Sequence, residues 1–260
     1  MADEGVIYVA TGQDYLELAC ASAASVRATN PGLEIDVFTN DMDAPELEIF
    51  DQAHPVPVDH DRAKLECMPK SRFERTLYLD CDTLVVASLG DVWDVLDRFE
   101  FALTHDVRRA SDLVQEGLEV STPYAFPQLN SGVLLYRKSP VTDTFFADWA
   151  ARFHASDVTR DQIILKDMLW RFDVRFYVLP PEFNLRRVTE LDAWEPLDAR
   201  VKIIHSHRLL QHIRVPGATR VRDFEELLRI ERIALAQEWR DVGLESPGRL
   251  DKIMWFTRPF

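Results

Sequence analysis

The stretch RTLYLDCDTLVV, residues 75–86, contains an apolar run, two acidic residues one position apart, and a second apolar run. Short apolar runs of this kind predict buried strands. A carboxylate at the end of a buried strand is costly unless it has a partner, and two neighbouring carboxylates repel each other unless a cation lies between them. Oxygen ligands suit hard cations such as Mg²⁺ or Mn²⁺. The stretch therefore predicts a divalent metal site at Asp80 and Asp82.

Two other interpretations of this acidic pair stay open. The two acids could instead cap a turn beside Arg72 or Arg75. The string is also similar to the opening motif of haloacid-dehalogenase phosphatases, in which the first aspartate is a nucleophile and the second a general acid. Those enzymes carry the motif near the start of the chain and follow it with a lysine and a second acidic pair. Here at least two predicted strands and a helix precede it, and this context favours the metal site.

Strand and helix patterns alternate on both sides of this stretch. Residues 6–10 and 35–39 are apolar runs typical of strands, and apolar residues between 15 and 26 fall on one helical face. This alternation predicts an α/β fold with a mostly parallel central sheet flanked by helices. Further strands are expected at residues 53–58, 101–104, 133–136, 175–179 and 201–204, and further helices at residues 141–153, 161–172 and 225–241.

Polar residues follow directly on several predicted strands. Ligands of such sheets bind at the carboxyl ends of the strands. An imidazole at a strand end suits a ligand set with two carboxylates, so His205 is the candidate third metal ligand. His207 is the alternative ligand, and an ordinary half-buried histidine is the simpler interpretation. The residues that directly follow a predicted strand are Thr11, Thr39, Asp80, His105 and His205.

Composition narrows the class of protein. The formal net charge of −14 at pH 7 disfavours binding to nucleic acid through the general field of the protein. Three cysteines without a C-x-x-C spacing support neither a disulfide framework nor a cysteine zinc site, which fits a reducing cytosol. The N-terminus lacks the features of a signal peptide, and no apolar stretch reaches the ~18 residues that span a bilayer. We expect a cytoplasmic protein with at most peripheral membrane contact. Its Trp255 and Phe256 either dock on the core, which is the simpler interpretation, or contact a partner or a membrane.

Four strings follow one another along the chain: LYLDCDTLVV, LNSGVLLYRKS, RDQIILKDML and VKIIHSH. Together with VATGQDYLELACASAASV near the N-terminus, they resemble the GT-A-fold glycosyltransferases, in particular glycosyltransferase family 8, which includes glycogenin and bacterial lipopolysaccharide galactosyltransferases. The resemblance runs from residue 6 to residue 208. It implies a GT-A fold, a nucleotide-diphosphate-sugar donor, bound Mn²⁺ or Mg²⁺, and transfer with retention of anomeric configuration.

The resemblance also implies roles for matching residues. Asp80, Asp82 and His205 would bind the metal, and Asp161 and Gln162 would be the catalytic residues beside the transferred sugar. The residues implied to hold the nucleotide-sugar lie against its base, ribose, diphosphate or sugar. They are Ala10, Thr11, Asp14 and Tyr15 in the first loop, Arg62 and Lys64 near the diphosphate, Asp80 and Cys81 at the metal and ribose, Asn130 at the sugar, and Arg208.

Several of these residues have a structural alternative. Asn130 is also a typical turn residue before Ser-Gly, and Asp161 also suits the start of a helix. Arg62 and Lys64 are also ordinary surface charges. Cys81 fits better as a small residue between strand and ligand than as a nucleophile, because no clear base lies near it in the sequence.

Two parts of the chain depart from the family pattern. Residues 205–212 have neither the glycine nor the lysine of the family's last motif, so Arg208 or Arg214 is the candidate replacement for that charge. The first loop has Gly12-Gln13 where many members carry acids, so the nucleobase is not inherited from the resemblance.

We expect residues 1–210 to form a GT-A nucleotide-sugar-binding and catalytic domain, with residues 211–260 as a helical extension packed on it. The expected activity is transfer of a hexose to a hydroxyl acceptor, such as a glycan, a lipid-linked sugar or a small molecule. Three alternatives remain. They are a sugar nucleotidyltransferase of the same fold, a phosphatase with Asp80 as nucleophile, and a nucleotide-sugar-binding protein without turnover.

Overall fold

The computed structural model describes residues 3–58, 60, 62–245, 251, 252 and 254. Trp255 and Phe256, for which the sequence predicts docking on the core, lie outside these residues. The chain divides into two compact units. The first unit comprises Met1–Arg186 and Ala199–Ser206, and the second comprises Arg187–Asp198 and His207–Phe260. The domain boundary predicted at residue 210 stays a prediction.

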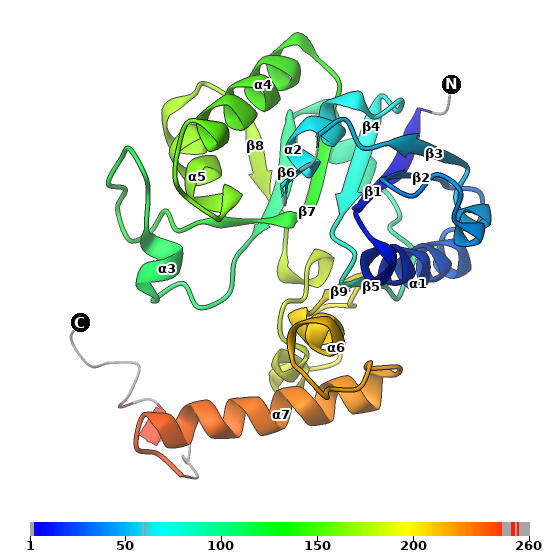
Figure 1. Cartoon of the computed structure of the whole chain (residues 1–260). Helices are drawn as coiled ribbons and strands as arrows, with labels where there is room; N and C mark the ends of the chain where they lie inside the picture. The colour runs from blue at the N-terminus through cyan, green and yellow to red at the C-terminus, as the bar shows by residue number, and fades with distance from the viewer. Residues whose placement is uncertain (1–2, 59, 61, 246–250, 253, 255–260) are drawn as a thin grey trace. The chain divides into compact units, whose positions relative to one another are not determined.

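A seven-stranded sheet forms the centre of the first unit, in the order β3-β2-β1-β4-β7-β6-β8 (Figure 1). Neighbouring strands are parallel, except that β7 runs antiparallel to both β4 and β6. The predicted α/β fold with a mostly parallel sheet is therefore confirmed. The strands are β1 (Glu4–Ala10), β2 (Glu34–Thr39), β3 (Gln52–Pro55), β4 (Arg75–Leu79), β6 (Phe101–His105), β7 (Leu129–Arg137) and β8 (Phe176–Val178).

Helices pack against this sheet: α1 contacts β1, and α5 contacts β7 and α4. Sequence signals explain where α4 begins, because the Ser139 hydroxyl accepts the backbone N–H of Thr142 while Pro140 occupies the first turn. The α-helices of the first unit are α1 (Gln13–Thr29), α2 (Lys64–Cys67), α3 (Asp112–Gln115), α4 (Pro140–His154) and α5 (Asp161–Arg171). Its 3₁₀ helices are η1 (Pro45–Ile49), η2 (Met68–Lys70), η3 (Val92–Asp97) and η4 (Pro181–Phe183).

An aromatic cluster fills the core between the sheet and α4. The rings of Phe101 and Phe145 lie 4.8 Å apart, and those of Tyr136 and Phe146 lie 4.9 Å apart. Trp149 is fully buried, and its indole N–H donates to the backbone oxygen of Asp161 over 3.0 Å. This bond connects the packed core directly to the first residue of α5.

A second, two-stranded sheet connects distant parts of the first unit. Strand β5 (Thr83–Val85) pairs antiparallel with β9 (Ile203–His205), with Thr83 opposite His205. Leu185 lies on the other side of β9, where its N–H donates to Ile203 and its carbonyl accepts from His205. These pairings bring residues 82, 184 and 205 together although they are far apart in the chain.

The structure adjusts several predicted boundaries. The strand expected at residues 53–58 is the shorter β3, and the strand expected at residues 201–204 is β9 at Ile203–His205. The four-residue helices α2 and α3 were not predicted, because so short a helix leaves no periodic apolar pattern. None of the helices in the described part of the chain is both long and apolar enough to cross a membrane.

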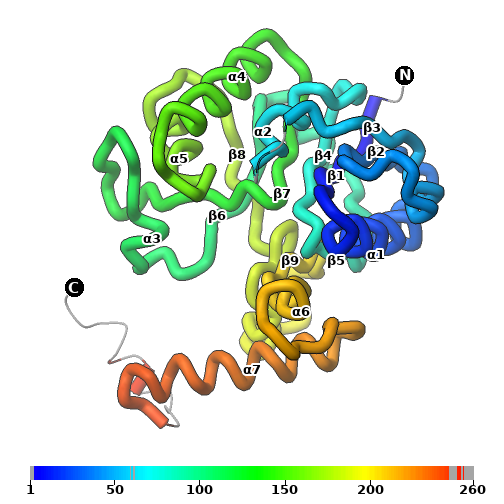
Figure 2. The backbone as a smooth tube through the Cα atoms, viewed as in Figure 1, coloured from blue at the N-terminus to red at the C-terminus, as the bar shows by residue number. Residues whose placement is uncertain are grey.

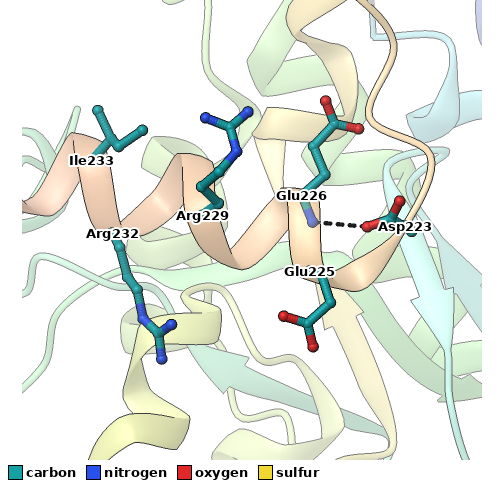
Figure 3. Close-up of a pocket in the computed structure, with 6 residues that line it drawn as sticks. All are labelled: Asp223, Glu225, Glu226, Arg229, Arg232 and Ile233. Carbon is teal, nitrogen blue, oxygen red and sulfur yellow. Dashed lines mark hydrogen bonds between the residues drawn. The ribbon is translucent and has the colours of Figure 1, made fainter.

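The second unit is helical, with η5 (Val188–Ala193), η6 (His207–Leu210), α6 (Gln211–Arg214) and the long helix α7 (Phe224–Asp241) (Figure 2). Helix α7 contacts η5 and η6, and its Arg232 pairs with Asp192 of η5 over 2.6 Å. At its start, the Asp223 carboxylate accepts the backbone N–H of Glu226 beside a pocket of mixed charge (Figure 3). None of the residues lining that pocket is a site residue predicted from the sequence.

Gly5 in β1 leaves room for a buried ring. A Cβ atom at this position would lie 2.3 Å from Cζ of Phe73, whose side chain is fully buried. We expect Gly5→Ala to lower the free energy of unfolding by roughly 1–3 kcal/mol, because the ring or the strand must move. Urea unfolding followed by circular dichroism measures this loss. The double variant with Phe73→Leu should lose less than the sum of the two single variants, and an unchanged Gly5→Ala midpoint would contradict the close contact.

Candidate metal centre and active site

Asp80, Asp82 and His205 form a cluster in the first unit. Asp80 follows β4 directly, Asp82 immediately precedes β5, and His205 ends β9. The Nε2 atom of His205 lies 3.3 Å from Oδ1 of Asp82 and 3.8 Å from Oδ2 of Asp80. One potential ligand atom from each residue lies within 4.8 Å of the others. The structure therefore brings together the three residues that the sequence predicts as metal ligands, and His205 rather than His207 is the histidine of the cluster.

The two carboxylates of this cluster have different surroundings. Oδ1 of Asp80 accepts the Tyr78 hydroxyl at 2.5 Å and also lies 3.7 Å from Nζ of Lys64. Asp82 is buried, which by itself raises its pKa, but His205 and Arg186 outweigh the burial and hold the pKa of this carboxyl below its ordinary value. Both side chains thus offer carboxylate oxygens toward the same imidazole.

The types of the three potential ligands and the tautomer of His205 fit a divalent cation. Two carboxylates and one imidazole suit Mn²⁺ or Mg²⁺ completed by other oxygen ligands. The Nδ1 atom of His205 lies 3.0 Å from Oδ1 of Asn184, which accepts its proton. In the neutral ring, which is the form that binds a metal, the Nε2 lone pair then faces the carboxylates, as in metal sites whose histidine donates its second N–H to a neighbouring oxygen.

A buried ion pair lies next to the cluster of Asp80, Asp82 and His205. Asp161 accepts the Ser131 hydroxyl at 2.6 Å and lies 3.2 Å from the Lys64 ammonium. Burial raises the pKa of Asp161, but Lys64, Ser131 and Arg62 together hold it below its ordinary value. The Asp161 carboxylate does not cap the start of α5 and instead faces Lys64 and Ser131. Lys64 thus stands between Asp161 and Asp80.

Asn130 and Gln162 lie beside the same cluster. The Nδ2 atom of Asn130 donates to Oε1 of Gln162 over 3.2 Å, and its Oδ1 accepts the backbone N–H of Gly132 at 3.0 Å. Arg62 donates twice to the backbone oxygen of Thr159, just before α5. The predicted catalytic residues Asp161 and Gln162 therefore lie at the end of α5 that faces Lys64 and Asn130, while contact of Asn130 and Arg62 with a donor stays a prediction.

The predicted nucleobase loop lies at the same edge of the sheet. Ala10 is buried at the end of β1, whereas Thr11 and Asp14 are exposed and Tyr15 is half-buried. Cys81 donates its thiol to the backbone oxygen of Val9, and burial together with the neighbouring aspartates raises the pKa of this thiol well above its usual value. The thiol is therefore protonated, which suits a spacer and not a nucleophile.

The two arginines that the sequence offers as phosphate-binding residues belong to the second unit. Arg208 lies in η6 and Arg214 in α6. Their role near a phosphate stays a prediction.

Three residues that support the cluster were not predicted from the sequence, although a signal existed for one of them. Gly132 makes space for the cluster, because a Cβ there would lie 2.2 Å from Cε1 of His205 and 2.4 Å from Oδ2 of Asp80. Asn184 reaches His205 only through the pairing of distant segments. Tyr78 could have been found, because it lies two positions before Asp80 and alternate residues of a strand share one face.

The depressed pKa of Asp161 predicts a dependence of stability on pH. A carboxyl whose pKa is lower in the folded state adds stability above its unfolded pKa of ~3.9 and loses it as pH falls through the folded value. The free energy of unfolding of the wild type should therefore decrease as pH falls below ~4, and Asp161→Asn should flatten this decrease. Urea unfolding between neutral and acidic pH measures both curves. If the free energy of unfolding of the two proteins fell equally at acidic pH, the depressed pKa of Asp161 would be contradicted.

Comparisons with known proteins bear on the fold. No family model matches the sequence, and no curated protein matches it. The glycosyltransferase GlyE of Streptococcus pneumoniae TIGR4 aligns over 95% of this chain and 66% of its own chain, with a TM-score of 0.58 and 18% identity. The galactosyltransferase LgtC, in complex with donor and acceptor sugar analogues, aligns over 91% of this chain and 99% of its own, with a TM-score of 0.53 and 16% identity.

A third similar structure is the bifunctional glycosyltransferase WbbM, which aligns over 84% of this chain with a TM-score of 0.54 and 14% identity. This chain spans 66% of the length of GlyE and 46% of the length of WbbM. At such identities the likeness concerns the fold. The chain therefore has the fold of these glycosyltransferases, the GT-A fold that its motifs predict.

Proposed function

We propose that this protein is a metal-dependent glycosyltransferase that transfers a hexose from a nucleotide-diphosphate-sugar to a hydroxyl acceptor. The observation that carries the proposal is the convergence of Asp80, Asp82 and His205 beside the buried Asp161–Lys64 pair. This convergence lies where strands of the sheet end, which is the ligand-binding edge of such folds. The similar folds of GlyE, LgtC and WbbM, all glycosyltransferases, support the same class of activity.

The proposed site separates groups that serve the leaving group from groups that serve the sugar. Asp80, Asp82 and His205 would hold Mn²⁺ or Mg²⁺, which as a Lewis acid stabilises the negative charge of a departing nucleoside diphosphate. Lys64 adds a fixed positive charge, held in place by Asp80 and Asp161. Preorganised charges of this kind favour the transition state because they need not reorient during the reaction.

Asp161 and Gln162 are the proposed catalytic residues. Positive charge develops on the sugar as the bond to the leaving group breaks, and carboxylate or amide oxygens close to it lower its free energy. Asp161 remains ionised because its pKa is depressed. An active-site glutamine-to-glutamate mutant of LgtC has been crystallised, and Gln162 is the candidate counterpart in this chain. Retention of anomeric configuration is part of the proposal and follows from the family resemblance.

Thr11, Asp14, Tyr15 and Cys81 are proposed to hold the base and ribose. We propose no nucleic-acid partner, because the net charge of −14 disfavours one. Residues 1–210 remain the proposed catalytic domain, residues 211–260 the proposed extension, and the cytoplasm the proposed location.

A thermal-shift panel of nucleotide-sugars, each with Mn²⁺ and with a chelator, tests the function. We expect one donor to raise the melting temperature only when Mn²⁺ is present, because a ligand that binds the folded state stabilises it by about 2.7 kcal/mol at 100 times its Kd. That donor should also release its nucleotide in the presence of the protein. Donor binding without release would identify a binding protein, and formation of a nucleotide-sugar from a nucleoside triphosphate would identify a nucleotidyltransferase. Phosphate release with a phospho-aspartate at Asp80 would identify a phosphatase.

A further inference from the structure

A continuous chain of hydrogen-bonded side chains leads from the metal cluster to the loop after β6. His205 Nδ1 lies 3.0 Å from Oδ1 of Asn184, and Asn184 Nδ2 donates to Oδ1 of Asn130 over 2.9 Å. Asn130 Nδ2 then donates to Oε1 of Gln162 over 3.2 Å. Gln162 Nε2 donates to Oδ2 of Asp106 over 2.6 Å. Three successive bonds thus connect His205 with the proposed catalytic residue Gln162, and a fourth continues to Asp106.

Two groups, one that can only donate and one that can only accept, determine which way each hydrogen bond of this series runs. The backbone N–H of Gly132 donates to Oδ1 of Asn130, and a backbone N–H cannot accept. The carboxylate of Asp106 at the far end accepts and cannot donate. A reversed Asn130 amide would place its NH₂ group against the N–H of Gly132. Because Asn130, Asn184 and His205 are each 3% exposed, water cannot readily compensate for such a reversal.

The orientation of Asn184 follows from that of Asn130. Its NH₂ group must face Oδ1 of Asn130, so its own oxygen faces Nδ1 of His205. In the neutral ring the proton of His205 is thereby held on Nδ1, and the Nε2 lone pair faces Asp80 and Asp82. Without an acceptor at Nδ1, a neutral His205 would place its proton on Nε2 and donate to Asp82 Oδ1, 3.3 Å away, which blocks metal binding.

We propose that Asn184 is a positioning residue that selects the metal-binding tautomer of His205, with its own orientation set by Asn130 and the backbone of Gly132. The inference rests on the metal site of the proposed function. Asn130 then has two roles. Its amide oxygen orients Asn184, the partner of His205, and its NH₂ group holds Gln162.

The same criterion separates this cluster from a second one. Among the residues that the structure describes, His60, Glu66 and His154 also bring potential ligand atoms within 4.8 Å of one another. There, however, Nδ1 of His60 accepts the backbone N–H of Arg62 at 3.0 Å, so a neutral ring carries its proton on Nε2, which lies 3.2 Å from Oε2 of Glu66. His60 therefore lacks the arrangement found at His205, in which an acceptor holds the ring proton on Nδ1 and leaves the Nε2 lone pair free.

Metal affinity of the full chain, measured by electron paramagnetic resonance of free Mn²⁺, tests the proposal. Asn184→Leu should weaken Mn²⁺ binding by about 10- to 100-fold, the usual loss when a partner of a metal ligand is removed. Asn184→Asp keeps an acceptor for the Nδ1 proton and adds negative charge near the cation, so it should retain or raise the affinity. Thermal melting verifies that both variants are folded.

Asp106→Asn is the matched control at the other end of the chain of bonds. Because Gly132 anchors Asn130 independently, this variant should leave Mn²⁺ affinity unchanged while freeing the amide of Gln162. Nitrogen NMR of the Mg²⁺-loaded wild type should show the His205 proton on Nδ1. Wild-type affinity in Asn184→Leu, a His205 proton on Nε2, or a loss in Asp106→Asn equal to that in Asn184→Leu would overturn the inference. If the wild type bound no Mn²⁺, the proposed metal dependence would fail, and this inference with it.

Discussion

Asp82→Asn is expected to abolish metal-dependent binding of the donor and to lower turnover by about 10³-fold. The asparagine keeps the shape of the side chain but removes one of the two negative charges that face His205. A bound metal contributes several kcal/mol to stabilising a charged leaving group, and each 1.36 kcal/mol corresponds to a tenfold change in rate. Nucleotide release from the donor and its thermal shift with Mn²⁺ measure the two effects.

A surface acid provides the control for this variant. Asp97 pairs with Arg75 at 2.5 Å with 57% of its side chain exposed, so Asp97→Asn should leave both readouts unchanged. The Asp82→Asn protein should remain folded, although Arg186 and His205 lose part of their compensation. A full metal-dependent shift in Asp82→Asn would count against the metal assignment.

Gly132→Ala is the second change with a large expected effect. Its methyl group would lie 2.2 Å from Cε1 of His205 and 2.4 Å from Oδ2 of Asp80, whereas ordinary contacts begin near 3.4 Å. The strand cannot move away easily, because the carbonyl of Gly132 accepts the N–H of Asp80 at 2.7 Å. The two proposed metal ligands must therefore separate, and Mn²⁺ affinity should fall by at least about 100-fold, beyond the usual loss for a supporting residue.

Gly5→Ala is the matched control for Gly132→Ala. Both variants add one methyl group to the same sheet, and both should lose roughly 1–3 kcal/mol of stability through overpacking. In Gly5→Ala the methyl group meets the Phe73 ring and no metal ligand, so Mn²⁺ binding should be retained. Equal Mn²⁺ affinity in the two variants would show that space at Gly132 does not determine the geometry of the cluster.

Much of the first unit follows from local patterns. The apolar runs before Thr11 and Asp80 predict β1 and β4 because a strand buried on both faces needs apolar residues at nearly every position. The helical periodicity after residue 160 predicts α5 for a similar reason. The acidic pair could also be recognised, because Asp80 follows a buried strand directly and Asp82 immediately precedes the next one, where an unpaired charge is costly. The brief helices α2 and α3 were missed, since one turn has no period to detect.

Local sequence patterns could not predict which side chains from distant parts of the sequence come together. His205 was a candidate from its position after an apolar run, but only the pairing of β5 with β9 decides that it faces Asp82 and that His207 lies outside the cluster. Lys64 and Asp161 were each named from the resemblance, yet nothing in the sequence indicates that they form a buried pair. Asn184 had no signal, because an asparagine after a 3₁₀ turn is common in loops.

The amino-acid sequence alone determined the α/β class, the positions of most strands and the acidic pair of the proposed metal site, since periodicity and burial cost act within a few residues. The tertiary structure decided which histidine joins that pair, which amide orients it and why residue 132 is a glycine. These depend on strand register between segments more than 50 residues apart, as for Asn130 and Asn184, and a shift of one residue in register would turn every such side chain to the opposite face.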